Sequence, residues 1–531
     1  MNSQKAVLLP DNKDIIAELQ DEQKRKERLL FLVICGIAVF LTPLVVLAGI
    51  NLGLGLIVAI IAVIVLTSAI VRWPKLGFFV IVGCVVFIDQ SPLLVPVVTD
   101  RLYVYYWPTA LEGLIERPIG FLFLFILFVI ICRRIVKREF LLRGGALLVP
   151  LLLFSLCLVG GAAYGYLTGG DVKIIVVELR PFVYLFESYL IAYNLVTRKS
   201  DVYAFFWFVI IGAGVKALQG IYIYIKLHGQ LGDATLMSHE ESYFFCGLLL
   251  LVILLSLHNR YRPQLIAALV VLPVVVVTLV LNNRRADYIA LLAGLGVAWI
   301  LMFIVTQRAR KMLAIIAIAS ILLGGGYILA FANSTSGIGL PAHAIVSVFN
   351  PSSTDIRNAD SNQYRTTEDY DLKYTVEHNN FLFGLGFGKP YLQPIPLTTL
   401  FQAISSFDPY YNYVPHNNIY WIWMRLGAVG FMAFWYLIGS IIVRGSLIAR
   451  QLRDRYLQMM AIYIVGMTIM EIIVAFADYQ LFFYRNVIYI GLLAGILMKL
   501  PELDKEEEKT LAEIPASTQM NDRKTSVATF R

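Results

Sequence analysis

The chain has 531 residues, of which 59% are hydrophobic and only 15% are charged, and its mean hydropathy is +0.73. A soluble domain carries roughly 25% charged and about 45–50% apolar residues, so a soluble fold of this length would expose too much apolar surface. The composition excludes a soluble enzyme, a disordered chain and a fibrous protein. The net charge of +8 is foremost a signal of membrane topology, and we expect no nucleic acid as a partner.

Apolar stretches of membrane-spanning length predict an all-α polytopic membrane protein with about fourteen transmembrane helices (12–14). The first stretch follows a charged segment, 1–28, and is too long for a cleaved signal peptide. The predicted spans are 29–50, 53–71, 76–98, 118–132, 146–167, 174–195, 202–222, 243–257, 264–282, 286–305, 312–331, 416–443, 456–476 and 486–499.

Alternate short loops between these spans carry 18 Lys and Arg residues, and the positive-inside rule places those loops and both termini in the cytoplasm. The five cysteines lie in or at the ends of spans and indicate no disulfide. The expected organisation is a cytoplasmic tail (1–28), a bundle of about eleven spans (29–331), a long external loop (332–414), about three further spans (415–500) and a disordered cytoplasmic tail (501–531).

The segment 332–414 is the one long loop on the external side. Long loops without a function are uncommon in compact proteins. We therefore expect short helices that form a lid or substrate-binding element over an outward-facing cavity; the alternative is a solvated spacer.

Charged residues inside spans are costly and usually mark function or a paired structural site. Arg180 precedes Pro181, which should kink its helix, and it is expected to hold an anion in an external cavity. The alternative is a structural pair with Glu187, seven residues further on the same face. Arg425 with Glu471 is expected to be a structural pair between the last spans.

Arg284 and Arg285 open the tenth predicted span on the external side, where the charge rule disfavours cations. Guanidinium groups bind phosphate oxygens in bidentate fashion, and a helix start adds free N–H donors. Because neighbours on a helix diverge by about 100°, one arginine should face the site while Asp287 pairs with the other. The alternative is snorkelling at the membrane interface.

His416 follows Pro415 at the entry of the twelfth predicted span, directly after the long loop. A neutral imidazole at the mouth of a cavity can accept a proton from a sugar hydroxyl, although a lone interfacial histidine is more often inert. The sequence contains no HExxH, GxSxG or Walker motif, and we expect neither a metal nor a cofactor.

Three motifs resemble the O-antigen ligase and polymerase superfamily of bacterial surface-polysaccharide enzymes. They are the glycine-rich run from Phe381 to Gly388, Pro415-His416-Asn417-Asn418 running into Arg425-Leu426-Gly427-Ala428-Val429-Gly430, and Arg284-Arg285 before a small-residue apolar helix. Arg365 stands in the loop where this family usually has an arginine. The chain departs from the family at Arg425, where a glutamate is usual.

The resemblance implies a fold like that of C-type glycosyltransferases and a metal-independent, inverting transfer of glycan from undecaprenyl diphosphate, on the outer face of the bacterial inner membrane. His416 would be the catalytic base. The substrate-binding residues would be Arg180, Arg284, Arg285, Arg365 and Asn417. The partners would be the lipid-linked donor, an acceptor glycan or glycolipid and membrane lipid, with a flippase and a chain-length regulator as candidate protein partners.

Within this family we expect an O-antigen or exopolysaccharide polymerase. The alternative is a ligase that transfers the finished glycan to the lipid A core or to a protein, which shares the donor and differs in the acceptor. A flippase or another transporter is a further alternative, for which polar residues and broken helices near the midplane are typical. A non-catalytic scaffold would leave the external arginines unexplained.

Overall fold

The computed structural model is helical throughout the residues that it describes, apart from loops, short 3₁₀ turns and one isolated bridge between Asn380 and Gly384. The described residues are 54–91, 93, 95–97, 99, 102, 104–107, 116–139, 142–230, 236–257, 262–306, 310–334, 337–349, 356–397 and 410–513. The helices are α2 (Leu54–Arg72), α3 (Pro74–Phe87), α4 (Pro118–Lys137), α5 (Leu148–Leu167), α6 (Val172–Leu195), α7 (Lys199–Lys226), α8 (His239–Ser256), α9 (Arg262–Asn282), α10 (Arg285–Val305), α11 (Arg310–Phe331), α12 (Leu340–Phe349), α13 (Ile356–Glu377), α16 (Asn418–Gln451), α17 (Arg455–Ala475) and α18 (Tyr484–Glu513).

Ten helices in this described part of the chain are long and apolar enough to cross a membrane: α4, α5, α7, α8, α9, α10, α11, α16, α17 and α18. The protein is therefore an all-α, multi-pass membrane protein, as its composition predicts. Helix α6 has the length of a span, 24 residues, but its buried charges exclude it from a count based on hydropathy. The predicted span 29–50 lies outside the described residues, and the total of fourteen spans stays a prediction.

The third predicted span is shorter than expected. It was assigned to 76–98, but α3 ends at Phe87, and the described residues that follow it are not helical. Proline disfavours helical backbone in the residue before it, and Pro92 and Pro96 follow closely. Asp89, buried just beyond the helix end, is thereby free to bond with a neighbouring helix.

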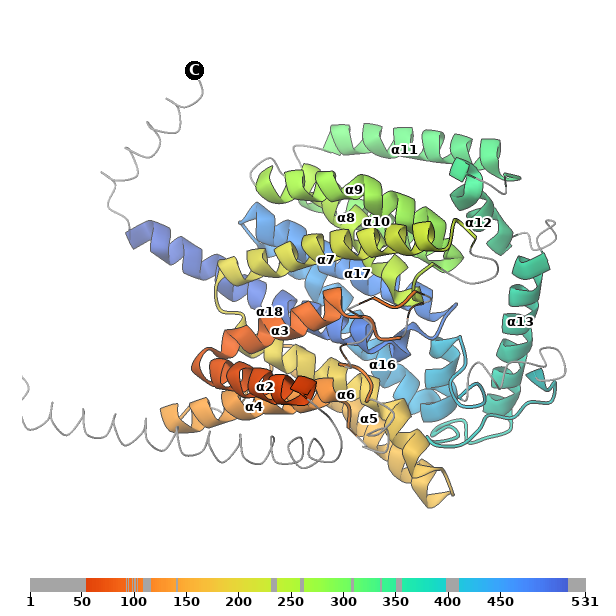
Figure 1. The fold of residues 1–531 in the computed structure, drawn as a ribbon, viewed down its shortest axis with the longest axis horizontal. Coiled ribbons are helices and arrows are strands. Elements are labelled where there is room, and N and C mark those ends of the chain that lie inside the picture. The colour runs from red at the N-terminus through yellow and green to blue at the C-terminus, as the bar shows by residue number, and fades with distance from the viewer. Residues whose placement is uncertain are drawn as a thin grey trace, which may run out of the picture.

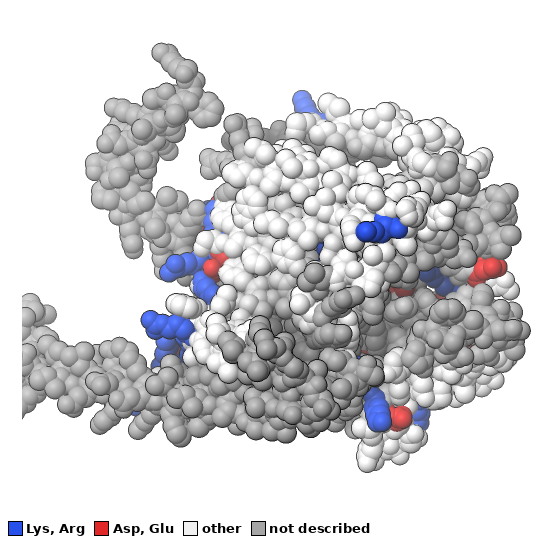
Figure 2. All heavy atoms as spheres, in the orientation of Figure 1, with Lys and Arg blue, Asp and Glu red and all other residues white. Residues whose placement is uncertain are grey.

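The basic loops meet at one end of the bundle. Lys75, in the first turn of α3, forms an ion pair of 2.5 Å with Asp201 in the first turn of α7. Lys199 in turn bonds to Asp454, between α16 and α17. Figure 2 shows Lys and Arg gathered at the left end of the molecule, with a largely uncharged band beside them. We call this end the basic end.

Helices α6, α17 and α18 form the interior of the bundle, and α11 lies at its edge (Figure 1). Of the apolar span, 83% is buried inside the protein in α17 but only 6% in α11. Helix α12 continues from α11, and α13 stands across the end of the bundle opposite the basic end. The described residues of the segment 332–414 include α12 and α13, and α13 places a polar helix over the starts of α10 and α16. A lid over an outward-facing cavity stays a prediction.

Helix α16 is broken where the glycine-rich loop enters it. Gly427 has φ 60° and ψ −166°, a backbone conformation essentially restricted to glycine. At this break, the N–H groups of Ala428 and Val429 donate to the carbonyl oxygens of Phe381 and Leu382 at 2.9 and 3.2 Å. The loop therefore replaces the hydrogen bonds that the break removes, which non-helical backbone at membrane depth requires.

The C-terminal tail is not disordered from its beginning. Helix α18 continues to Glu513, so residues 501–513 of the predicted tail 501–531 are helical. Lys, Glu and Leu dominate this segment and are strong helix formers. The prediction was wrong there because a high charge density was equated with disorder, and the rest of the tail lies outside the described residues.

Replacing Gly427 by alanine should destabilise the protein strongly. A Cβ at this position would lie 2.4 Å from the backbone of Leu382, and the strained backbone adds about 1–3 kcal/mol. We expect a lower thermal denaturation midpoint in detergent. Gly439→Ala on the same helix is the control, because its Cβ would meet nothing within 4 Å; equal midpoints of the two variants would contradict the broken-helix geometry.

Candidate functional site: a cationic cluster beside two histidines

The start of α10 is fixed by a sharp reversal after α9. Asn283 adopts the left-handed conformation, with φ 46°, which asparagine tolerates better than most residues. The preceding Asn282 is buried and accepts a hydrogen bond of 2.9 Å from the N–H of Met237. This turn places Arg284 at the N-terminal end of α10, facing α13.

The two adjacent arginines differ in their contacts. Arg285 donates from Nη2 to the Oγ of Ser361 on α13, at 3.3 Å. Arg284 has no hydrogen bond or ion pair among the described residues, and its Nε is buried without a partner. Asp287 and Asp478 act on Arg284 only through longer-range charge interactions, so the predicted contact pair between Asp287 and an arginine is not formed.

The charges of Arg284 and Arg365 repel each other, while Asp478 and Asp287 attract Arg284 more strongly than Arg365 repels it. Burial lowers the pKa of the Arg284 guanidinium, and the nearby charge of Arg365 lowers it further against the opposing effect of the acidic groups. Arg365, on α13, likewise has no hydrogen bond or ion pair in the described part of the chain. A buried cation without a partner is costly, and a bound anion would relieve that cost.

His416 is held in place by Glu368 of α13. The two side chains approach at 3.3 Å, between Nδ1 and Oε1, and the backbone N–H of His416 donates to Oε2 at 2.8 Å. Burial alone would lower the pKa of His416, but the charge and hydrogen bond of Glu368 outweigh it and raise the pKa above its ordinary value. Because Nδ1 bonds to Glu368, Nε2 is the ring nitrogen left for a substrate.

Asn417 has protein partners for both polar atoms of its side chain. Its Oδ1 accepts from the N–H of Tyr420 at 3.1 Å and caps α16, while its Nδ2 donates to Asp369 at 3.0 Å. Burial raises the pKa of Asp369 to about 6 despite this hydrogen bond. Asn417, predicted to bind substrate, therefore joins α16 to α13 and fixes the position of the neighbouring His416.

A second histidine–carboxylate pair adjoins the first, and sequence reasoning missed it. Nδ1 of His239, at the start of α8, bonds to Asp478, which follows α17. The rings of His239 and His416 both contact Tyr479, at centroid distances of 6.0 and 5.2 Å. Burial would raise the pKa of Asp478, but the two histidines and Arg284 hold it well below its usual range. The sequence held one indication of this pair: His239, Asp478 and His416 all lie at span ends on the external side of the predicted topology.

Arg180 belongs to a different polar cluster. It is buried in α6, and its Nη1 donates to the hydroxyl of Tyr484 at 3.0 Å. Tyr184, one turn further along α6, donates to Glu116 at 2.5 Å. The alternative pair with Glu187 is not formed, because Glu187 has no ion pair among the described residues and its Oε2 is buried without a hydrogen bond. Arg180 thus lies against α18 rather than beside α10 and α13.

Arg425 has a structural partner other than the predicted one. Its Nη2 forms a fully buried ion pair with Glu178 of α6 at 2.6 Å, whereas Glu471 accepts a hydrogen bond from Asn486. Arg425 also donates to three backbone carbonyl groups of the glycine-rich loop and the segment before His416: those of Gly386 at 3.1 Å, Lys389 at 2.6 Å and Tyr413 at 2.9 Å.

A second buried ionic network explains Asp89. Its Oδ1 lies 2.5 Å from the Nζ of Lys216 on α7, and Lys216 lies 3.6 Å from Glu241 on α8. Arg485 of α18 bonds to both Glu240 and Glu241. All five side chains are at most 1% exposed, so the network connects α7, α8 and α18 in the interior next to His239.

No cluster of three or more His, Cys, Asp or Glu side chains that could hold a metal ion lies within the described ranges. Comparison of the sequence with protein-family models and with curated proteins gives no match. A function for this protein must therefore be inferred from the chemistry of the cluster itself.

The variant Arg425→Gln should be strongly destabilised, because it leaves Glu178 buried without its cation. Breaking a buried pair from one side costs about 3–5 kcal/mol. We expect a large fall in the thermal denaturation midpoint and partial recovery when Glu178→Gln is added. Arg450→Gln, at an exposed position of the same helix, is the matched control. A midpoint equal to that of the control would mean that the pair does not hold the loop.

Proposed function

We propose that this protein is a membrane glycosyltransferase that moves a glycan from a polyprenyl diphosphate to an acceptor sugar hydroxyl, and that it acts as a polymerase of a bacterial surface polysaccharide. The observation that carries the proposal is the guanidinium of Arg284, which has no hydrogen bond or ion pair among the described residues and lies near Arg365. Arg365 in turn acts on His416, which is bonded to Glu368. Cations that lack a protein partner suit a diphosphate, and an imidazole oriented by a carboxylate suits a hydroxyl proton.

The reaction is a single displacement at the anomeric carbon. Nε2 of His416 accepts the proton of the acceptor hydroxyl as its oxygen forms the new bond to that carbon. The bond from the anomeric carbon to the phosphate oxygen breaks, and the electron pair leaves with the polyprenyl diphosphate. Arg284 and Arg365 stabilise the charge that develops on this leaving group, and one direct displacement inverts the anomeric configuration.

The proposed topology places the basic end in the cytoplasm, following the positive-inside rule. Helix α13, which carries Arg365 and Glu368, lies at the opposite end (Figure 1), so the cluster would then face outward from the bacterial inner membrane. Both termini would be cytoplasmic, with about fourteen spans and an arrangement like that of C-type glycosyltransferases. An outward site suits a donor whose glycan is assembled inside and used outside.

A direct assay tests this proposal. Purified protein in detergent, supplied with a glycan on undecaprenyl diphosphate and no nucleotide, should lengthen the glycan. Arg284→Ala should lower the rate by about 10²–10³, and His416→Ala by about 10²–10⁴. Arg285→Ala, with its contact to Ser361, should have a smaller effect.

Lys226→Gln is the control for this assay, because Lys226 is an exposed cation at the end of α7. Full activity of Arg284→Ala and His416→Ala would remove the proposed site. Movement of intact donor across liposomes without cleavage would instead establish a flippase, and transfer only to a lipid A core or to a protein would establish a ligase.

The rate should depend on pH through His416. A base must be neutral, so the rate should rise with pH through a pKa above the ordinary value of about 6.5, since Glu368 raises it. Glu368→Gln removes the negative charge, which lowers the pKa and moves the rising limb of the pH–rate profile to lower pH. An unshifted limb would mean that a group other than His416 titrates.

A further inference from the structure

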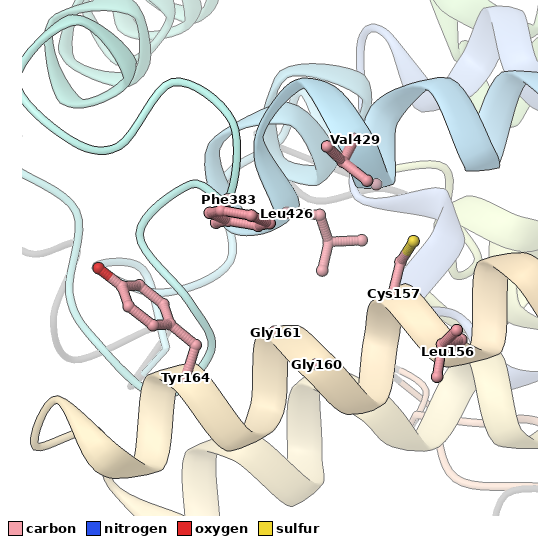
Figure 3. A pocket seen from close by; sticks show the side chains of 9 residues that line it. Leu156, Cys157, Gly160, Gly161, Tyr164, Phe383, Leu426 and Val429 are labelled. Atoms are coloured by element: carbon pink, nitrogen blue, oxygen red, sulfur yellow. The ribbon is translucent and has the colours of Figure 1, made fainter.

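An apolar groove of about 400 Å³ lies between α5 and α16. Figure 3 shows Leu156, Cys157 and Tyr164 of α5 on one side and Leu426 and Val429 of α16 on the other, with Phe383 of the glycine-rich loop at one end. Both helices are membrane spans. A groove of this composition therefore fits a hydrocarbon chain.

The groove lies in the half of the membrane nearer the candidate site. Arg143, just before α5, bonds to Asn194 near the end of α6, which places the start of α5 at the basic end. Leu156 and Tyr164 are 8 and 16 residues beyond Leu148, or about 12 and 24 Å along the helix axis. The chain of a lipid in the outer leaflet would reach this depth.

Neighbouring glycines of α5 shape the groove. A Cβ at Gly161 would lie 2.5 Å from Leu426, so glycine there allows α16 to approach. A Cβ at Gly160 would meet nothing within 4 Å, so this glycine faces open space in the groove. Helices α5 and α16 are therefore in contact at Gly161 and leave the groove open at Gly160.

A cation lies at the mouth of the groove. Nζ of Lys389 lies 5.9 Å from the ring centroid of Tyr164, a lining residue. The backbone of Lys389 is fixed by its hydrogen bond from Arg425, and its ammonium group has no ion pair among the described residues. The apolar groove therefore ends at a cation that has no ion pair among the described residues. This combination complements a lipid with a phosphate headgroup.

The groove and the arginine cluster lie on different sides of α16. Helix α5 packs against α6 and α16, while α10 packs chiefly against α17 and α8. The two regions are linked through Arg425, which donates to the carbonyl of Lys389 beside the groove and to the carbonyl of Tyr413, three residues before His416. A lipid in the groove would thus lie close to the loop that carries the base without occupying the arginine cluster.

We propose that the groove binds the polyprenyl chain of the acceptor, with Lys389 on its phosphate, while Arg284 and Arg365 hold the diphosphate of the donor. The inference rests on the proposed function. The donor's diphosphate gains charge as its bond breaks and needs several cations. The acceptor's phosphate does not react, and a single lysine is enough to anchor it.

The variant Gly160→Trp tests this assignment, because its side chain would fill the groove without meeting protein atoms at the Cβ. Gly439→Trp is the matched control: Gly439 has the same open surroundings on α16 and does not line the groove. For an acceptor glycan on polyprenyl phosphate, Gly160→Trp should raise the KM at least about tenfold. The KM of the donor and the rate with a lipid-free acceptor glycan should not change.

A raised KM for the donor would assign the groove to the donor chain and overturn the proposal. Equal effects of Gly160→Trp and Gly439→Trp, or no effect of either, would also overturn it. Lys389→Gln should weaken the lipid-linked acceptor alone, and Gly160→Leu serves if the tryptophan variant does not fold.

A binding measurement separates this inference from the proposed function. A photoreactive polyprenyl phosphate should label residues 147–168 in the wild type but not in Gly160→Trp, and excess phosphatidylglycerol should not prevent the labelling. Competition by phosphatidylglycerol would mean that ordinary lipid fills the groove. If the probe labels the groove but the protein transfers no glycan, the lipid site is supported and the proposed enzymatic reaction is rejected.

Discussion

The buried ion pair between Arg425 and Glu178 joins α16 to α6. The position of the glycine-rich loop and of the segment before His416 depends on it. The pair lies beside the break of α16 at Gly427, where the glycine-rich loop supplies the missing hydrogen bonds. The remaining donors of Arg425 hold the loop and Tyr413, from which the chain runs directly to His416. A buried pair repays its desolvation only when its other polar atoms are also bonded, and the nearby loop carbonyls supply most of those bonds.

Five of the cations described above differ in whether they contact a carboxylate. Arg425, Lys216 and Arg485 each contact a buried carboxylate, and they join helices. Arg284 and Lys389 have no such partner among the described residues; Arg284 lies at the start of α10 and Lys389 in the loop between α13 and α16. The first group stabilises a charged interior, and the second is where we propose that phosphates bind.

Span positions and the alternation of basic loops could be predicted from the sequence, because both depend on the hydropathy and charge of residues that are close together in the chain. The meeting of Lys75, Asp201, Lys199 and Asp454 at one end follows that alternation. Partners were less predictable. Asp89 had no predicted partner, and Arg425 was assigned the wrong one, because buried charges pair across helices that are distant in the chain. The approach of Arg284 and Arg365 was anticipated only through resemblance.

By itself, the sequence determined that the chain is a helical, multi-pass membrane protein, since long apolar runs have no other stable arrangement in lipid. It also located Arg284, Arg285 and His416 at span ends. Only the tertiary structure decided which of the charged side chains lie together. Packing set Arg180 against Tyr484, placed Glu368 on His416 and brought His239 beside it. Neighbouring charges select their partners by distance in space, and helix packing, rather than spacing along the chain, fixes that distance.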